Sequence, residues 1–124
     1  TNHPEHLIHK SSSGNLVRSK SESLIDMLLY INKIPFRYEC ALHFDSTTLY
    51  PDFTCLDTRT REEIIWEHFG LMGDPDYTES TVQKIAHYTA SGYTLGKNFI
   101  ATFENAASPL SVKQVQAYIK SLLM

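Results

Sequence analysis

Two acidic residues, Asp52 and Glu67, lie in short segments that a single β-hairpin would bring together. If the turn of this hairpin is centred between Arg59 and Thr60, Asp52 lies directly opposite Glu67. Side chains opposed in this way have Cβ atoms about 5 Å apart, and two carboxylates that close repel each other unless they bind a cation or share a proton. Carboxylate oxygens suit Mg²⁺, with Mn²⁺ as an alternative, so we predict a metal site held by Asp52 and Glu67.

The residues around the two carboxylates support this register. Phe53, Cys55, Ile64 and Trp66 would form one apolar surface of the hairpin, while the carboxylates would share the other surface. Two alternatives stay open on the sequence alone. Acidic residues near strand ends are often simply solvated, and a shift of one residue in the pairing would put the two carboxylates on opposite faces.

The hairpin belongs to a longer succession of helices and strands. Leu24, Ile25 and Leu28 follow helical spacing ahead of Pro35, and apolar and polar residues alternate over 36–44. The predicted helices cover 21–33, 76–91 and 111–123, and the predicted strands cover 36–44, 50–56, 63–69 and 98–104. This order, α-β-β-β-α-β-α, predicts an α/β (α+β) fold with a central four-stranded mixed sheet flanked by helices.

The composition limits the classes of protein to which the chain can belong. Its 124 residues suit one domain, which we place at 17–124, after a polar stretch at 1–16 that is typical of a flexible linker or tail. No apolar run is long enough to span a membrane and no signal-peptide pattern opens the chain, so we expect a soluble, cytoplasmic protein. Cys40 and Cys55 are too few for a disulfide scaffold, and we expect free thiols.

Three short segments carry a resemblance to a known superfamily. They are Arg18-Ser19-Lys20-Ser21-Glu22, Tyr50-Pro51-Asp52-Phe53 and Trp66-Glu67-His68-Phe69-Gly70. In this order, the chain from about Val17 onward resembles the PD-(D/E)xK (restriction-endonuclease-like) nucleases, and more narrowly a group of small, mostly uncharacterised bacterial domains. Members carry Pro-Asp on one strand and a carboxylate on the next, after a leading helix that bears a glutamate.

The resemblance implies Mg²⁺-dependent phosphodiester hydrolysis, with nucleic acid as the partner and DNA favoured over RNA. Asp52 and Glu67 would bind the metal together with the backbone carbonyl of His68. Glu22 would hold a second metal or act through a water molecule. Arg18 and Lys20, at the start of the leading helix, would contact substrate phosphate with the help of free helix amides. Solvation is the plain alternative for both of these basic side chains.

The chain departs from the superfamily pattern at Phe69, where a lysine is usual. In some relatives this lysine moves to the following helix, where Lys84 is the natural candidate for a catalytic residue. In the predicted helix 76–91, Lys84 belongs to a polar stripe that is separate from the expected core face. The polar stripe consists of Tyr77, Thr81, Lys84 and Tyr88, and the expected core face consists of Val82, Ile85, Ala86 and Thr89. A plain solvated lysine is the alternative.

Several polar residues also have a structural interpretation. Ser19 and Glu22 fit a capping box, in which Ser19 caps the helix and Glu22 reaches back to the amide of the cap residue. We expect Glu39 to pair with Arg37 or Arg61. Because His68 follows Glu67 on a strand, we expect the His68 side chain on the apolar face.

The formal net charge of −3 bears on the choice between two functions. Binding to nucleic acid usually calls for a basic surface, although a bound cation changes the local charge balance around clustered carboxylates. The chain lacks an initiator methionine, so it could be a fragment whose further nucleic-acid contacts lie in another domain. The alternative to an active nuclease is a catalytically inactive module of the same fold that binds nucleic acid or a protein partner.

Overall fold

The computed structural model describes residues 4–44 and 46–124. In chain order its elements are η1 (Pro4–His6), β1 (His9–Lys10), β2 (Leu16–Val17), α1 (Lys20–Ile31), β3 (Phe36–Tyr38), β4 (Leu42–His43), β5 (Thr48–Leu49), β6 (Phe53–Asp57), β7 (Glu62–Phe69), α2 (Pro75–Ala90), β8 (Phe99–Phe103) and α3 (Val112–Leu122). Among these residues no helix has both the length and the apolar character that crossing a membrane requires.

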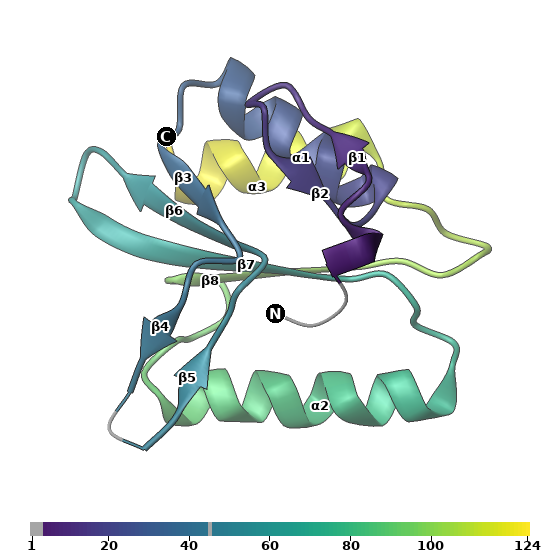
Figure 1. Ribbon diagram of the computed structural model, residues 1–124. Coiled ribbons are helices and arrows are strands. Elements are labelled where there is room, and N and C mark those ends of the chain that lie inside the picture. Colours follow the sequence, from purple (N-terminus) through teal and green to yellow (C-terminus); the bar gives the residue numbers. More distant parts are fainter. Residues whose placement is uncertain (1–3, 45) are drawn as a thin grey trace.

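A mixed sheet forms the centre of the molecule. Its strand order is β3-β6-β7-β8, with antiparallel pairing except between β7 and β8, which are parallel because α2 connects them as a crossover. Helices α1 and α3 cover one face and α2 lies along the other (Figure 1). The predicted α/β class with a four-stranded mixed sheet between helices is thereby confirmed.

The β6–β7 pairing has the predicted register, with Phe53 opposite Trp66 and Cys55 opposite Ile64. All four side chains are buried in the core under α1 and α3. Ile65 lies between Ile64 and Trp66 on β7, so its side chain points to the opposite face, where it packs with Tyr88 of α2. The alternation of side chains along each strand therefore divides the interior into two cores, one on each side of the sheet.

Each of the three long helices begins at a polar side chain that accepts a hydrogen bond from the first turn. Ser19, Asp74 and Ser111 are these caps for α1, α2 and α3. At Ser111 the reciprocal bond from the cap amide to Gln114 is also present, which completes a capping box. These local signals explain why the predicted helix bounds agree with the structure to within two residues.

The predicted strand 36–44 is wrong as a single strand. The chain leaves the sheet after Tyr38, because Glu39 takes a positive φ of 50°. Leu42–His43 then forms β4, which pairs with β5 in a separate hairpin on the α2 side of the sheet (Figure 1). Leu42 and Leu49 of this hairpin pack against the core under α2, so the apolar alternation continues although the sheet partner changes.

The predicted tail at 1–16 also differs from the structure over the described part. Residues 1–3 lie outside the described residues, whereas β1 and β2 form a short hairpin beside α1 (Figure 1). Asp26 of α1 is fully buried and accepts hydrogen bonds from the amide and hydroxyl of Ser13 and the side chain of Asn15. A serine-rich segment resembles a tail in composition, but here its polar groups satisfy a buried carboxylate.

Candidate functional site

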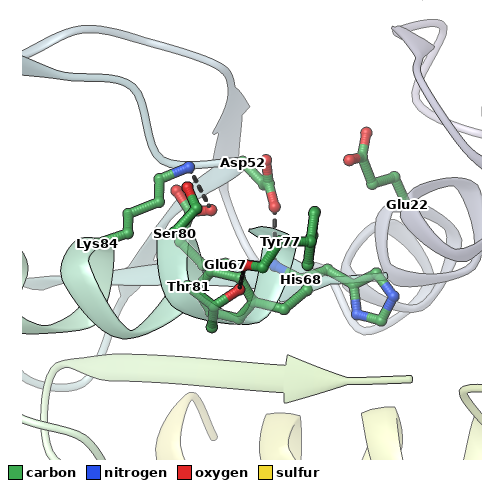
Figure 2. A pocket seen from close by; sticks show the side chains of 9 residues that line it. Glu22, Asp52, Glu67, His68, Tyr77, Ser80, Thr81 and Lys84 are labelled. Carbon is green, nitrogen blue, oxygen red and sulfur yellow. Dashed lines mark hydrogen bonds and ion pairs between the residues drawn. The ribbon is translucent and has the colours of Figure 1, made fainter. Parts of the chain in front are cut away.

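A cavity of about 190 Å³ lies between α2, the sheet and the start of α1. Its lining residues are mostly polar, and they are Glu22, Asp52, Glu67, His68, Phe69, Tyr77, Ser80, Thr81 and Lys84. Figure 2 shows side chains from three elements meeting around this space, with Glu22 contributed by α1 and Lys84 by α2. Four residues that the sequence analysis proposed as catalytic, Glu22, Asp52, Glu67 and Lys84, therefore line one cavity.

Asp52 and Glu67 lie next to each other on the α2 side of the sheet. Asp52 directly precedes β6, and continuing the β6–β7 register by one residue places it opposite Glu67. Two backbone contacts fix Asp52. Its carbonyl accepts a hydrogen bond from the Glu39 amide at 2.9 Å, and its Oδ2 accepts one from the His68 amide at 2.7 Å. The side-by-side placement that the sequence analysis expected is the one the structure has.

Both carboxylate oxygens of Glu67 have partners on α2. The Tyr88 hydroxyl donates to Oε1 at 2.8 Å, and the Lys84 ammonium lies 3.1 Å from Oε2. The Glu67 side chain is almost fully buried, whereas 41% of the Lys84 side chain is exposed. Lys84 therefore spans from solvent to a buried carboxylate, and its charge compensates that of Glu67 (Figure 2).

The two carboxyl groups hold their protons more strongly than in water. Burial, and then the negative charges of Glu67 and Glu22, raise the pKa of Asp52 well above its usual value. Burial also raises the pKa of Glu67, although Lys84 and the Tyr88 hydroxyl act in the opposite direction. A site that leaves two adjacent carboxylates short of positive charge favours either a proton or a cation between them.

The face of α2 that contacts the sheet is not the one expected from its aliphatic residues. Thr81 and Tyr88 are buried, while Val82 is 62% exposed. Of the expected core residues, only Ile85 packs against the core under α2. The helix instead buries the stripe that carries its tyrosines, because their rings fill the core and their hydroxyls bind polar groups of the sheet. This orientation also brings Lys84 to the cavity.

Glu22 lines the cavity, but its carboxylate already accepts hydrogen bonds from other residues. Its Oε1 accepts hydrogen bonds from the Tyr38 hydroxyl at 2.5 Å and from the Arg18 amide at 3.2 Å. Ser19 caps α1 as expected, by accepting from the Glu22 amide, but the Glu22 side chain reaches Arg18 rather than the amide of the cap. Within the described part of the chain, no group of three or more His, Cys, Asp or Glu residues is arranged to hold a metal ion.

The basic residues at the start of α1 do not line the cavity. The Arg18 guanidinium binds Glu39 through two hydrogen bonds, with an Nε–Oε2 distance of 2.6 Å. The expected pairing of Glu39 with Arg37 or Arg61 is therefore wrong, because the turn after β3 directs Glu39 toward α1 instead. Lys20 is exposed at the first residue of α1. The contacts of these basic residues with phosphate stay predictions.

The side chain of His68 lies on the other face of the sheet, as its position predicts, and belongs to a polar network that the sequence analysis missed. Its Nδ1 is 2.8 Å from the Thr102 hydroxyl and its Nε2 is 2.6 Å from Glu104 Oε1. The Ser21 hydroxyl of α1 donates to the same Glu104 oxygen. Burial acts to raise the pKa of Glu104, but the hydrogen bonds from Ser21 and His68 outweigh it, and the pKa is lowered.

This network ties the start of α1 to the ends of β7 and β8, beside the cavity. The network holds His68, whose backbone amide donates a hydrogen bond to Asp52. The role of Glu104 could have been suspected from the parallel pairing of β7 with β8, which puts the end of the predicted strand 98–104 beside His68. The role of the His68 carbonyl as a metal ligand stays a prediction.

Comparison of the chain with protein-family models, with curated proteins and with solved structures finds no match in any of the three.

Replacing Asp52 with asparagine is expected to stabilise the metal-free protein at neutral pH, raising the melting temperature by about 2–5 °C. The amide keeps an acceptor for the His68 amide but removes the charge that repels Glu67. Because the pKa of Asp52 is raised in the folded protein, its ionisation opposes folding above that pKa. The gain should shrink as the pH falls through the folded pKa toward the ordinary value of 3.8. Thermal melts of both proteins across pH, in EDTA, check this. A wild type that is the more stable protein at neutral pH would contradict it.

Proposed function

We propose that this chain is a Mg²⁺-dependent phosphodiester hydrolase, a nuclease acting on DNA, in which Asp52 and Glu67 bind the cation. The observation that carries the proposal is the pair of adjacent carboxylates with raised pKa values, facing Lys84 across a polar cavity. Strongly perturbed acids grouped in a cavity are typical of functional sites, because catalytic and metal-binding groups need the shifted pKa values that burial and neighbouring charges produce.

The donor set fits a hard cation. Mg²⁺ usually takes one or two protein carboxylates and completes its coordination shell with water and substrate phosphate. Asp52 and Glu67 supply two carboxylates, and Asp52 Oδ1 has no hydrogen-bond partner among the described residues. A cation between them would offset the repulsion that raises the pKa of Asp52. Mn²⁺, which also accepts oxygen ligands, is the alternative ion.

Several residues around the cavity would have separate roles in the proposed hydrolysis. A bound divalent cation would polarise the scissile phosphate and make a water molecule more acidic. The His68 amide holds the Asp52 carboxylate in place, and the Tyr88 hydroxyl orients that of Glu67. The Lys84 ammonium would turn from Glu67 toward the phosphate, where it would offset the charge that develops on the phosphoryl oxygens. Glu22, fixed by Tyr38, would act on the solvent side through a water molecule.

The order of elements supports the proposed superfamily. Apart from the β4–β5 hairpin inserted after β3, the succession α1, β3, β6, β7, α2, β8 is the one that the resemblance to PD-(D/E)xK nucleases implies. The Pro-Asp pair directly precedes β6, and the second carboxylate lies on the adjacent strand β7. We propose the restriction-endonuclease-like topology on this basis, with Lys84 in place of the lysine that Phe69 replaces.

A specific observation also favours the alternative, an inactive module that binds nucleic acid or a protein. Lys84 and Tyr88 already occupy both oxygens of Glu67, so this carboxylate is satisfied without a metal. In an inactive module the ion pair would only stabilise the packing of α2 on the sheet. In an active enzyme the same lysine would exchange partners when the cation and substrate bind.

The test is to incubate the protein with plasmid DNA, RNA and a small phosphate diester in the presence of Mg²⁺, Mn²⁺ or EDTA. We expect DNA cleavage that requires the metal, and a melting temperature that rises with metal concentration. Ligand at about a hundred times its Kd stabilises the native state by about 2.7 kcal/mol, a shift that thermal melts detect easily. A metal-dependent shift without cleavage would support the inactive module. The absence of both cleavage and a metal-dependent shift would overturn the metal site, in an active enzyme and in an inactive module alike.

A further inference from the structure

A second cavity, of about 470 Å³, lies over β3 and β6 beside the turn that precedes β7. It shares no lining residue with the cavity of Asp52 and Glu67. Pro35 and Leu56 give it apolar walls, while Arg37, Arg61 and Thr54 contribute polar groups. A cavity of this size has room for a small organic ligand as well as for a single ion.

The two arginines carry charges that the protein does not compensate with an ion pair. Arg37 and Arg61 are exposed, and neither guanidinium has a hydrogen bond or an ion pair within the described residues. By contrast Arg59, in the same turn as Arg61, binds Asp57 with an Nη2–Oδ2 distance of 3.0 Å. The second cavity therefore presents two free guanidinium groups, each with donors arranged for an oxyanion.

Thr54, which lines the cavity, has a buried hydroxyl group without a partner among the described residues. Thr54 is only 7% exposed, and its Oγ1 is the one buried side-chain polar atom of the described residues that makes no hydrogen bond. Thr54 lies directly opposite Arg37 in the β3–β6 pairing, which puts the two Cβ atoms about 5 Å apart. An unsatisfied buried hydroxyl is costly to keep, so its presence beside two free arginines indicates an absent ligand.

We propose that Arg37, Arg61 and Thr54 form a binding site for a phosphate group. A phosphate offers enough oxygens to accept from both guanidinium groups and from the hydroxyl at once, whereas a carboxylate has only two. Glu63 also lines the cavity and leaves it with one net positive charge, which sets a moderate affinity. The apolar walls would contact the organic part that carries the phosphate. This site goes beyond the proposed hydrolysis and does not depend on it.

The experiment follows the backbone amide resonances of the ¹⁵N-labelled full chain while inorganic phosphate is added in the presence of EDTA. We expect saturable shifts for Arg37, Thr54 and their neighbours. Arg37→Ala and Arg61→Ala should each weaken the affinity by about tenfold. Arg59→Ala is the matched control, because it removes the same charge from the same turn but from an arginine already bound to Asp57, and it should change the affinity by less than about twofold.

Thr54→Val tests the hydroxyl group and keeps the shape of the side chain. Because it removes an unsatisfied polar atom, it should raise the melting temperature by about 2–5 °C, so loss of binding cannot be confused with unfolding. The phosphate affinity should nevertheless fall by about threefold or more. An affinity that is unchanged in Thr54→Val or in either arginine variant contradicts the proposal.

Two further probes separate the possible sources of the phosphate group. A nucleoside monophosphate and a single-stranded oligonucleotide are titrated in the same way, the second with the Asp52→Ala protein to exclude cleavage. Oligonucleotide binding that depends on Arg61 assigns the site to a nucleic-acid backbone. Binding of inorganic phosphate and the mononucleotide alone assigns it to a free phosphorylated compound. If none of the three probes binds saturably, the proposal is wrong.

Discussion

Asp52→Ala is expected to lower Mg²⁺-dependent DNA cleavage by about a thousandfold or more, because it removes a carboxylate that the proposed chemistry cannot replace. The fold should survive, since Asp52 lies beside a cavity and the two hydrophobic cores are built from other residues. Glu67→Gln is expected to act in the same way on cleavage. The measurement is the initial rate of plasmid nicking at saturating Mg²⁺, with circular dichroism to check folding.

The matched control for this prediction is Glu62→Ala, which removes an exposed carboxylate from the same strand as Glu67. It should cleave at the rate of the unsubstituted protein. If the Asp52→Ala protein cleaves DNA as fast as the unsubstituted protein, this cavity does not perform the reaction.

Lys84→Ala is expected to separate metal binding from catalysis. The rate at saturating metal should fall by about a hundredfold, because the one ammonium group among the described residues that line the cavity is removed from the phosphoryl oxygens. The Mg²⁺ concentration for half-maximal rate should fall as well, since the lysine no longer competes with the cation for Glu67. Rates measured over a range of Mg²⁺ concentrations give both quantities.

Lys113→Ala, which removes a lysine from the exposed side of α3, controls for the loss of one positive charge. Lys84→Arg should recover part of the rate, because a guanidinium can still reach the phosphate. An unchanged rate in Lys84→Ala would assign Lys84 to the packing of α2 on the sheet and remove it from the mechanism.

The sequence was sufficient to predict the part of the site that depends on the β6–β7 hairpin. Its register could be worked out because both faces constrain it at once. Phe53 and Trp66 must share one face of the hairpin. The next residue pair of the same register then places Asp52 beside Glu67 on the other face. A shift by one residue would have put the two carboxylates on opposite faces and separated Phe53 from Trp66, so few alternatives were compatible with the pattern.

The orientation of α2 could not be predicted in the same way. Its aliphatic residues suggested one buried face, but Tyr88 fills more of the core than Val82 could and finds a hydrogen-bond partner in Glu67. Tyrosine counts as partly polar in any pattern based on hydropathy, so the stripe that carries it looked exposed. The partner that makes its burial favourable is on a different element, and only the tertiary structure brings the two together.

The remaining differences have a similar origin. Glu39, at which the predicted strand ends, binds Arg18, a residue that is far away in the sequence. Ser13 is ordered by Asp26, and Glu104 is held by His68 and Ser21. Each of these contacts joins polar side chains across long sequence separations, and polar side chains leave no periodic signal from which such a pairing could be read.

The central claim is that Asp52 and Glu67 hold one divalent cation, and the most direct measurement is the anomalous scattering of crystals of this protein soaked in Mn²⁺. The account predicts a single strong peak within ligand distance of a carboxylate oxygen of each residue, with Lys84 displaced from Glu67. Bound Mn²⁺ elsewhere on the molecule, with the Lys84–Glu67 ion pair intact and no peak between the two carboxylates, would contradict it.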